Sequence, residues 1–318
     1  MTNPFRVPGF DDDPMRPLCP WDKDTAEHEK YYVPIDHTAE SFAMFTEQMA
    51  NPDSLRRNGR FVLVAGQGGC GKTSLVNRCA NWLRKELRDS HGITVKIINL
   101  TKASSGSDTV PDRMTQASRR LADEIKMSKV VPDEELLESI VASRDRFEEL
   151  YPRLSRALND KLVLVVLLPP IDLVVQTANI MEEIRQYSRM VDGKLVMFIE
   201  VTLAEEPTER LAVGRESFAT RPLVLPVRPL KDGDAAVFSD ARAALHDAVG
   251  GFPRMTREAK EKIDDNPNIS VSFLQNLLYH VYEERRRGND RYSDRDVVSY
   301  ADITDYVFRH SDVQRPRF

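Results

Sequence analysis

Five short apolar runs dominate the chain up to about residue 225. They cover residues 61–65, 93–100, 162–168, 195–201 and 223–225. Apolarity that continues through a run without alternation is typical of strands in a parallel sheet that is covered on both faces. Because helical patterns separate most of the runs, they predict a doubly wound α/β domain with a five-stranded parallel sheet.

Amphipathic stretches of helical period connect these runs. Residues 41–50 carry apolar side chains at near-helical spacing, and residues 51–53 (Asn-Pro-Asp) are expected to end that helix. Two or three helices, including residues 113–129 and 133–150, are predicted between the second and third runs. Another helix is expected after the third run, over residues 173–191. The helix after the first run has a clear apolar face, formed by Leu75, Val76, Cys79, Ala80, Leu83 and Leu87.

Beyond Pro229 the pattern becomes purely helical. Helices are predicted over residues 234–249, 254–264 and 270–286, and a last helix contains Ile303, Tyr306 and Val307. Ser299, followed three residues later by Asp302, is the capping-box signature that begins this last helix. A helical domain is therefore expected to follow the sheet.

Composition and charge narrow the class of protein. The chain has 318 residues, of which 41% are hydrophobic and 30% charged, as in globular proteins with a sizeable core. Its net charge of -5 gives no overall attraction to nucleic-acid phosphates, so such contact would need a local basic patch. The amino terminus lacks the apolar stretch of a secretory signal, and the run at 162–168 is too short to cross a bilayer. Three scattered cysteines, Cys19, Cys70 and Cys79, do not indicate disulfides or a metal site, so a cytoplasmic location is predicted.

A phosphate-binding loop follows the first apolar run. The sequence G-x-x-x-x-G-K-[ST] is matched at every required position by Gly66, Gln67, Gly68, Gly69, Cys70, Gly71, Lys72 and Thr73. Glycines let backbone N–H groups converge on phosphates, and the helix that follows adds partial positive charge at its amino terminus. Lys72 should reach the β- and γ-phosphates, the Thr73 hydroxyl should bind Mg²⁺, and Ser74 completes the predicted binding segment.

The sequence therefore predicts three structural regions. Residues 1–30 carry many prolines and charges without a sustained period and are expected to form an extended N-terminal arm. Residues 31–228 are expected to form the P-loop NTPase domain, and residues 229–318 a helical lid. The expected ligands are ATP and Mg²⁺.

This layout resembles the AAA+ ATPases and their relatives, the signalling STAND ATPases and the small helper ATPases of replication initiation and transposition. The resemblance rests on the phosphate loop, the five strands and the helical region after the last strand, and it covers residues from about 31 to 318. Residues 227–230 (Val-Arg-Pro-Leu), followed by a helix from Asp234, are similar to the entry into such a lid.

The resemblance also implies acidic residues that this chain lacks. In the family the third strand ends in an acid that organises magnesium, usually followed by an acid that activates water. Here Pro169 and Pro170 take both positions, and Asp172 follows three places later than the first acid is expected. Proline cannot accept a proton, so either hydrolysis is absent or another carboxylate acts. Glu200, near the end of the fourth strand, is the best substitute by topology, because strand ends surround the ligand.

Further candidate residues come from the same resemblance. Thr202 lies where the family places a polar γ-phosphate sensor. Arg210, Arg215 and Arg221 lie where ring-forming relatives place an arginine that reaches a neighbouring subunit's nucleotide, and Arg215 represents them as the catalytic candidate. The second sensor arginine is replaced by the segment 270–273 (Ser-Val-Ser-Phe). The run at 283–287, with Arg315 and Arg317, could contact nucleic acid, although mixed charges at a helix end more often form a solvated face.

Three functions compete at this point. The first is an ATP-dependent switch or assembly factor with weak or absent hydrolysis, acting as a homo-oligomer or by recruiting a protein partner. The second is an active ATPase that remodels or moves a partner with displaced catalytic acids. The third, a GTPase or small-molecule kinase, is disfavoured because no D-x-x-G segment follows the second or third strand, and residues 99–102 (Asn-Leu-Thr-Lys) lack the acid that reads guanine.

Overall fold

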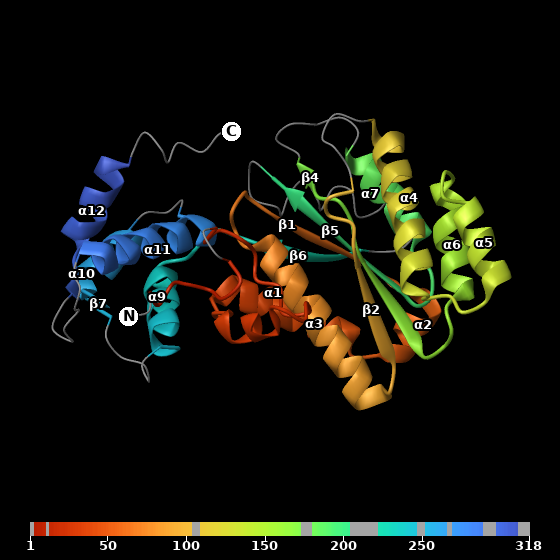
Figure 1. The fold of residues 1–318 in the computed structure, drawn as a ribbon, viewed down its shortest axis with the longest axis horizontal. Coiled ribbons are helices and arrows are strands. Elements are labelled where there is room, and N and C mark those ends of the chain that lie inside the picture. The colour runs from red at the N-terminus through yellow and green to blue at the C-terminus, as the bar shows by residue number, and fades with distance from the viewer. Residues whose placement is uncertain are drawn as a thin grey trace. The chain divides into compact units, whose positions relative to one another are not determined.

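The computed structural model describes residues 3–10, 13–103, 109–172, 180–203, 222–246, 252–265, 269–288 and 297–310 (Figure 1). The chain divides into two compact units. Unit 1 comprises Met1–Ala39, Gly69–Ser74 and Arg228–Phe318, and unit 2 comprises Glu40–Gly68 and Leu75–Val227. The chain therefore passes from unit 2 to unit 1 at Gly69, inside the phosphate loop. It returns to unit 2 at Leu75, in the first turns of the helix that begins at Lys72.

Unit 2 is built on a parallel sheet, which confirms the predicted fold class. Its strands are β1 (Arg60–Gly66), β2 (Thr94–Asn99), β3 (Leu162–Leu167), β5 (Leu195–Thr202) and β6 (Leu223–Val227). They pair in the order β2-β3-β5-β1-β6, and a sixth, two-residue strand, β4 (Ile171–Asp172), pairs with β5. Because β1 lies between β5 and β6, the phosphate loop begins at an interior strand.

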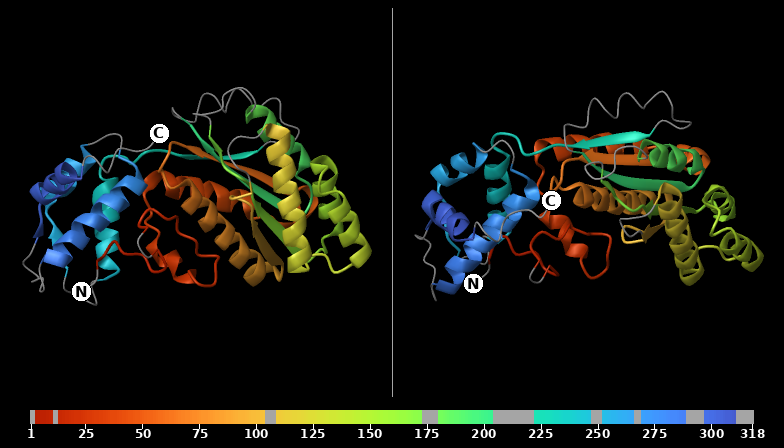
Figure 2. Two further views of the ribbon diagram at one scale, coloured as in Figure 1. Left: turned by 45° about the horizontal axis from the view of Figure 1, so that its top comes forward. Right: turned by 90° about the horizontal axis from the view of Figure 1, so that it is seen from above.

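Helices cover both faces of this sheet, as a doubly wound fold requires. Odd positions of β1 and β5, such as Leu63 and Met197, share one buried cluster with the helices α4 (Val110–Ser128), α6 (Phe147–Ala157) and α7 (Ile180–Met190). The opposite face is covered by α1 (Asp36–Met49) and α3 (Lys72–His91), where the Phe45 ring lies 5.7 Å from Phe198 and 5.9 Å from Trp82. Figures 1 and 2 show α3 and α4 on opposite sides of the strands.

One short helix between α1 and β1 was not predicted. Residues 51–53 end α1 as expected, but they also begin a second helix, α2 (Pro52–Asn58). The Asn51 side chain accepts a hydrogen bond from the Ser54 N–H, and Pro52 occupies the first helical turn. Proline there lacks only a donor that has no intrahelical acceptor, so the segment both stops one helix and starts the next.

The helix predicted over residues 133–150 is broken in the structure. α5 (Glu134–Ala142) ends at Ser143, and α6 begins at Phe147. Asp133 caps α5 by accepting from the Leu136 N–H at 3.0 Å. Ile140 of α5 and Phe147 at the start of α6 both belong to the buried cluster beside the sheet.

The helical lid predicted after the sheet is confirmed. Its helices are α9 (Asp234–Ala244), α10 (Arg257–Asp264), α11 (Val271–Gly288) and α12 (Tyr300–Arg309). The lid also contains a short parallel pair that the sequence did not indicate, β7 (Arg254–Met255) with β8 (Val297–Val298). Pairing of Arg254 in β7 delays the start of α10, which is capped by the Thr256 side chain at the Ala259 N–H.

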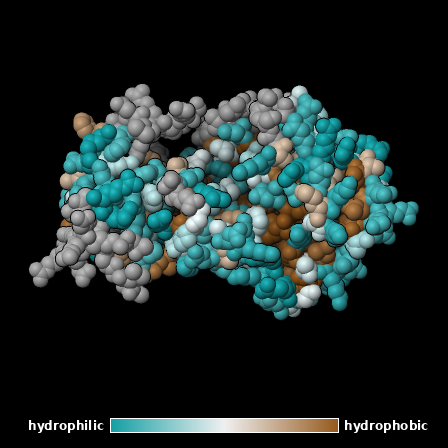
Figure 3. All heavy atoms as spheres, viewed as in Figure 1, coloured by the Kyte–Doolittle hydropathy of each residue, from teal (hydrophilic) through white to brown (hydrophobic). Residues whose placement is uncertain are grey.

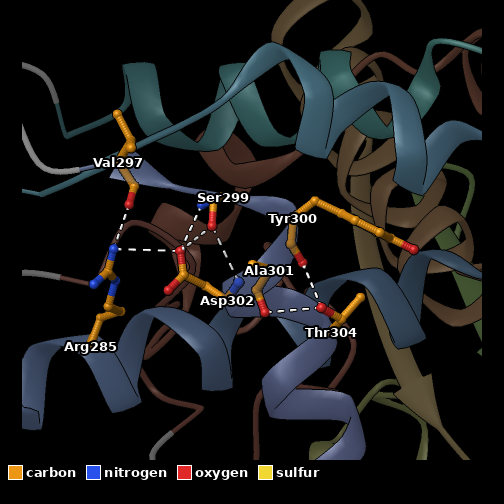
Figure 4. Close-up of polar contacts among 7 residues, drawn as sticks. All are labelled: Arg285, Val297, Ser299, Tyr300, Ala301, Asp302 and Thr304. Atoms are coloured by element: carbon orange, nitrogen blue, oxygen red, sulfur yellow. Dashed lines mark hydrogen bonds and ion pairs between the residues drawn. The ribbon is translucent and has the colours of Figure 1, made fainter.

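The predicted capping box begins α12 (Figure 4). The Ser299 hydroxyl accepts from the Asp302 N–H at 3.3 Å, and the Asp302 carboxylate accepts from the Ser299 N–H at 2.8 Å. Arg285 of α11 donates to the Val297 carbonyl at 2.6 Å and lies 3.5 Å from the Asp302 carboxylate. The cap therefore also ties α12 to the helix before it.

The N-terminal residues, expected to form an extended arm, have substantial buried structure. A 3-10 helix, η1 (Ala26–Tyr31), packs its Tyr31 into a small cluster with Val7, Phe10 and Leu18. Phe5 joins the buried cluster of the lid, where its ring lies 5.0 Å from Tyr282. Isolated apolar residues among prolines and charges do not reveal these contacts, because their partners are distant in sequence.

The surface in Figure 3 is largely hydrophilic, with smaller hydrophobic areas. Among the described residues, the large apolar side chains most exposed to solvent are Phe308 and Met127. Within the described parts of the chain, no helix is long and apolar enough to cross a membrane.

Candidate nucleotide-binding site

The phosphate loop joins β1 to α3 directly. Strand β1 ends at Gly66, and α3 begins at Lys72 and continues for 20 residues. Lys72 and Thr73 thus occupy the first turn of a long helix, whose unpaired N–H groups and partial positive charge favour an anion. The order of strand, loop and helix is the one that the motif requires.

Gly66 is placed by the close approach of two strands. A Cβ atom at this position would lie 2.0 Å from the carbonyl oxygen of Val227, the last residue of β6. Any side chain would therefore separate β1 from β6 at the start of the loop. The glycine is needed for sheet packing as well as for the loop.

Further along the loop, the backbone leaves room on its surface. Gly69 and Gly71 have φ values of +75° and +90°, which side chains with a Cβ rarely adopt. A Cβ at Gly68 or Gly71 would meet no atom within 4 Å, so open space adjoins the backbone there. Phosphate oxygens need such space to reach loop N–H groups, and the loop geometry therefore fits a phosphate ligand.

The side chains of the loop differ in exposure. Lys72 is buried, with 7% of its surface exposed, and Cys70 is buried at 1%. The Cys70 side chain is thus part of the packing beneath the loop, which agrees with a steric rather than a redox role. Gln67, Thr73 and Ser74 are partly exposed.

Two candidate polar residues lie at the carboxyl end of β5. Glu200 stands in register with Val64, and Thr202 stands in register with Gly66, the first residue of the loop. Both belong to the face of β5 opposite the cluster that contains Ile199 and Val201. Glu200 is 8% exposed. The sheet therefore brings Thr202 beside the start of the phosphate loop and Glu200 one row deeper.

Asp172 reaches the same edge through a break in the strand. In β3, Leu167 pairs with Phe198, whereas in β4, Asp172 pairs with Thr202. Five residues thus advance the chain by only four positions along β5, so one residue is extra, as in a β-bulge. Pro169 and Pro170, which cannot donate ladder hydrogen bonds, lie in this interval.

The extra residue decides which way Asp172 faces. A shift of one residue moves every following side chain to the opposite face of a sheet. Ile171 accordingly joins the buried cluster under α4 and α7, and Asp172 shares the opposite face with Thr202. Within unit 2, Asp172 and Glu200 therefore flank Thr202 on one face of the sheet edge.

Arg210, Arg215 and Arg221 lie outside the described residues, as do Arg315 and Arg317. Among the described residues, no group of three or more His, Cys, Asp or Glu side chains could hold a metal ion. Magnesium in nucleotide sites is usually held by one or two protein oxygens together with substrate phosphates.

The basic end of α11 carries matched charges. Arg286 donates to Glu283 at 3.1 Å, and Arg309 of α12 donates to Glu284 at 2.6 Å. Arg285 is bound to the Val297 carbonyl and lies near Asp302. These acidic partners reduce the net positive charge available to a nucleic-acid backbone on this helix.

Sequence patterns did not indicate three contacts to the loop inside unit 1. The Ser272 N–H donates to the Gly69 carbonyl at 3.0 Å, in the segment that replaces the second sensor arginine. The Leu18 N–H donates to the Ser74 hydroxyl at 3.1 Å, and the Tyr32 hydroxyl donates to the Ser74 carbonyl. Neither periodicity nor motif spacing relates residues so distant in the chain.

Comparison with known proteins gives the fold. No family model and no curated protein matches the chain. The structure of the ORC1 protein of Aeropyrum pernix in complex with DNA matches with a TM-score of 0.53 and 17% identity, over 90% of this chain and 68% of that one. The Aeropyrum pernix ORC2 protein, solved as ADPNP-ADP complexes, matches with a TM-score of 0.53 and 14% identity, over 91% of this chain and 71% of that one.

The chain has the fold of AAA+ P-loop ATPases. The resemblance predicted from the phosphate loop, the strand count and the lid is therefore confirmed at the level of fold. The chain carries the complete phosphate-loop motif and has two prolines at the positions where the resemblance implies acidic residues.

Proposed function

We propose that this protein binds ATP with Mg²⁺ through the segment from Gly66 to Ser74 and acts as a nucleotide-dependent switch or assembly factor with weak or absent hydrolysis. One observation carries the proposal. The complete phosphate-loop motif lies between an interior strand and a long helix, with open space beside Gly68 and Gly71. In the proposed complex the loop N–H groups and Lys72 hold phosphate oxygens, and the Thr73 hydroxyl holds the magnesium ion.

ATP is favoured over GTP by the region after β2. A guanine-reading segment needs an acid, and Asn99 to Lys102 has none. The Asn99 side-chain oxygen accepts from the Thr101 N–H at 3.0 Å and from its hydroxyl at 2.6 Å. In this turn the Asn99 side-chain oxygen is bonded to Thr101 rather than directed to a guanine base. The arrangement supports the preference for ATP.

Slow or absent hydrolysis follows from the two prolines after β3. A water-activating residue must accept a proton, and neither Pro169 nor Pro170 can do so. Without such a residue a bound triphosphate persists, and a persistent bound state suits a switch that recruits a partner or a second copy of the chain.

One specific observation favours the alternative, an active ATPase that remodels or moves a partner with displaced acids. The strand bulge turns Asp172 to the face of Thr202, with Glu200 on the same face. If either carboxylate orients water, the catalytic residues would be Asp172, Glu200 and Thr202. In an assembled form Arg215, or Arg210 or Arg221, would complete a neighbour's site.

The partner belongs to the proposal and is a second copy of the chain or another protein. The matched ORC1 protein of Aeropyrum pernix was solved with DNA. In this chain the acidic net charge and the paired arginines of α11 give weaker support for nucleic acid. DNA binding is therefore a secondary expectation, to be measured at stated salt concentration.

The test is calorimetric binding of ATP, ADP and GTP, each with and without Mg²⁺, followed by measurement of phosphate release. The proposal expects tight, magnesium-enhanced ATP binding, weaker GTP binding and little release. No binding of any nucleotide by the folded protein would overturn it. Rapid, partner-stimulated release would instead establish the remodeller.

A further inference from the structure

We propose that the N-terminal strap, residues 3–10 and 13–35, couples the lid helix α11 to the phosphate loop, and that Tyr32 is the positioning residue through which it acts. The inference rests on the proposed nucleotide binding and concerns its regulation. All the contacts involved lie within unit 1.

One end of the strap is fixed to α11. Phe5 is 1% exposed and belongs to the buried cluster of the lid. The Asn3 side chain donates to the Tyr279 carbonyl at 2.8 Å, and the Gln275 side chain donates to the Phe5 carbonyl at 2.6 Å. Two hydrogen bonds to the strap's first residues, one of them fully buried, hold it along the middle of α11.

The other end is fixed to the first turn of α3. The Tyr32 hydroxyl donates to the Ser74 carbonyl, and the Leu18 N–H donates to the Ser74 hydroxyl at 3.1 Å. Ser74 follows Lys72 and Thr73, the two residues proposed to hold phosphate and magnesium. A shift of Ser74 would therefore move both of them, because all three share one helical turn.

Between these ends, His28 holds the strap in one shape. The Cys19 N–H donates to His28 Nδ1 at 3.0 Å, so the ring proton lies on Nε2, which donates to the Pro8 carbonyl at 2.6 Å. Burial lowers the pKa of His28, which favours this neutral ring. His28 thus joins three parts of the strap, and a displacement at one end is carried to the other.

A third contact joins α11 to the phosphate loop directly. The Ser272 N–H, in the first turn of α11, donates to the Gly69 carbonyl at 3.0 Å. A Cβ at Gly69 would lie 2.7 Å from the Ser270 hydroxyl oxygen, so loop and lid helix are in close contact here. The loop segment from Gly69 to Ser74 is therefore held by α11 at one end and by the strap at the other.

Nucleotide binding should consequently change the strap. Phosphates that order the loop also order Gly69, which is bonded to α11, and Ser74, which is bonded to the strap. The strap is then a readout of the nucleotide state, positioned to present that state to a partner. Its exposed basic residue Lys23 gives trypsin a cleavage site in the strap.

The experiment measures hydrogen exchange of strap amides in the unaltered full-length chain, with and without ATP and Mg²⁺, alongside calorimetric ATP binding. Slower exchange at the Leu18 amide and slower tryptic cleavage after Lys23 are expected with ATP. The Lys72→Ala variant should show neither change. A chain that binds ATP with no change in the strap overturns this inference and leaves nucleotide binding intact, whereas a chain that binds no ATP overturns the proposed function itself.

Tyr32→Phe and Tyr31→Phe form a matched pair for the positioning role. Each removes one hydroxyl from adjacent tyrosines, but only Tyr32 bonds to Ser74. Tyr32→Phe should weaken ATP binding roughly 3- to 10-fold and reduce the strap's response, while Tyr31→Phe preserves both. Equal ATP affinity in the two variants, with equal strap responses, overturns the role of Tyr32. Thermal unfolding without nucleotide shows whether each variant folds. If Tyr32→Phe does not fold, the exchange measurement on the unaltered chain still tests the coupling.

Discussion

Asp172 and Thr202 stand opposite each other on neighbouring parallel strands, in the same row of the sheet as Gly66. Side chains in register on adjacent parallel strands share a face and lie about 5 Å apart at their backbones. Glu200, two residues before Thr202, shares that face. The edge of the sheet therefore carries two carboxylates beside a hydroxyl, although the expected acidic positions hold prolines.

We predict that the isolated protein hydrolyses ATP very slowly, because loss of a water-activating acid commonly removes about 10² to 10⁴ of rate. Any remaining rate should fall in Glu200→Gln or Asp172→Asn without weaker ATP binding, because each change removes only the charge. Asp160→Asn, at an exposed position before β3, serves as the control. Single-turnover phosphate release measures the effect. Several turnovers per second without a partner would contradict slow hydrolysis. Unchanged rates in both variants would show that neither carboxylate takes part in it.

Lys72→Ala should abolish tight nucleotide binding while leaving the fold intact. The ammonium neutralises the β- and γ-phosphates, and its loss should weaken ATP binding by more than about 100-fold. Calorimetry gives the affinity, and circular dichroism checks the fold. Lys96→Ala, which removes an exposed lysine of β2, should bind like the unaltered chain. A folded Lys72→Ala variant with undiminished ATP affinity would show that the loop does not bind the nucleotide as proposed.

Thr73→Ala should weaken the magnesium-dependent part of ATP binding selectively. The hydroxyl is the predicted protein ligand of the ion, so affinity without magnesium should change little. Thr73→Ser keeps a hydroxyl and should retain most of the magnesium effect. Titrations with Mg²⁺ and with a chelator separate the two contributions. Equal losses under both conditions would argue against a role for Thr73 in holding the metal.

ATP should raise the oligomeric state reversibly if an arginine from one copy completes the site of another. Charge-assisted hydrogen bonds across that contact would stabilise the assembled form. Arg215→Ala is the first variant to examine, followed by Arg210→Ala and Arg221→Ala. The responsible change should abolish association and leave ATP binding by the monomer nearly intact. Light scattering at several protein concentrations measures the mass, and a mass that stays monomeric with ATP would favour recruitment of a different protein.

Ser299→Ala should destabilise the lid by about 1 kcal/mol, because it removes the acceptor for the Asp302 N–H at the start of α12. Thr304→Ala is the control within the same helix, since the Thr304 hydroxyl donates to the carbonyls of Tyr300 and Ala301, which lie on its own helix (Figure 4). Urea unfolding compares the two variants. Equal stabilities would show that the capping box contributes little to the lid.

Much of the fold was readable because its signals are local. Continuous apolarity identifies the buried strands, the Ser299 and Asp302 spacing identifies a helix start, and the glycines with Lys72 and Thr73 identify the phosphate loop. Each of these patterns lies within about ten residues, and each follows from the geometry of one element. The fold class and the lid could therefore be predicted without tertiary contacts.

The tertiary structure decided what depends on partners distant in the chain. Pro169 and Pro170 indicate that the strand after Leu167 is interrupted. Only the pairing with β5 shows that one residue is extra and that Asp172 lies on the face of Thr202. Tyr32 gives no local signal because its acceptor, Ser74, lies 42 residues away. Gly66 likewise fits its motif, yet its contact with Val227 exists only once β6 packs beside β1. Register and long-range hydrogen bonds are properties of the assembled sheet and strap, and local periodicity does not encode them.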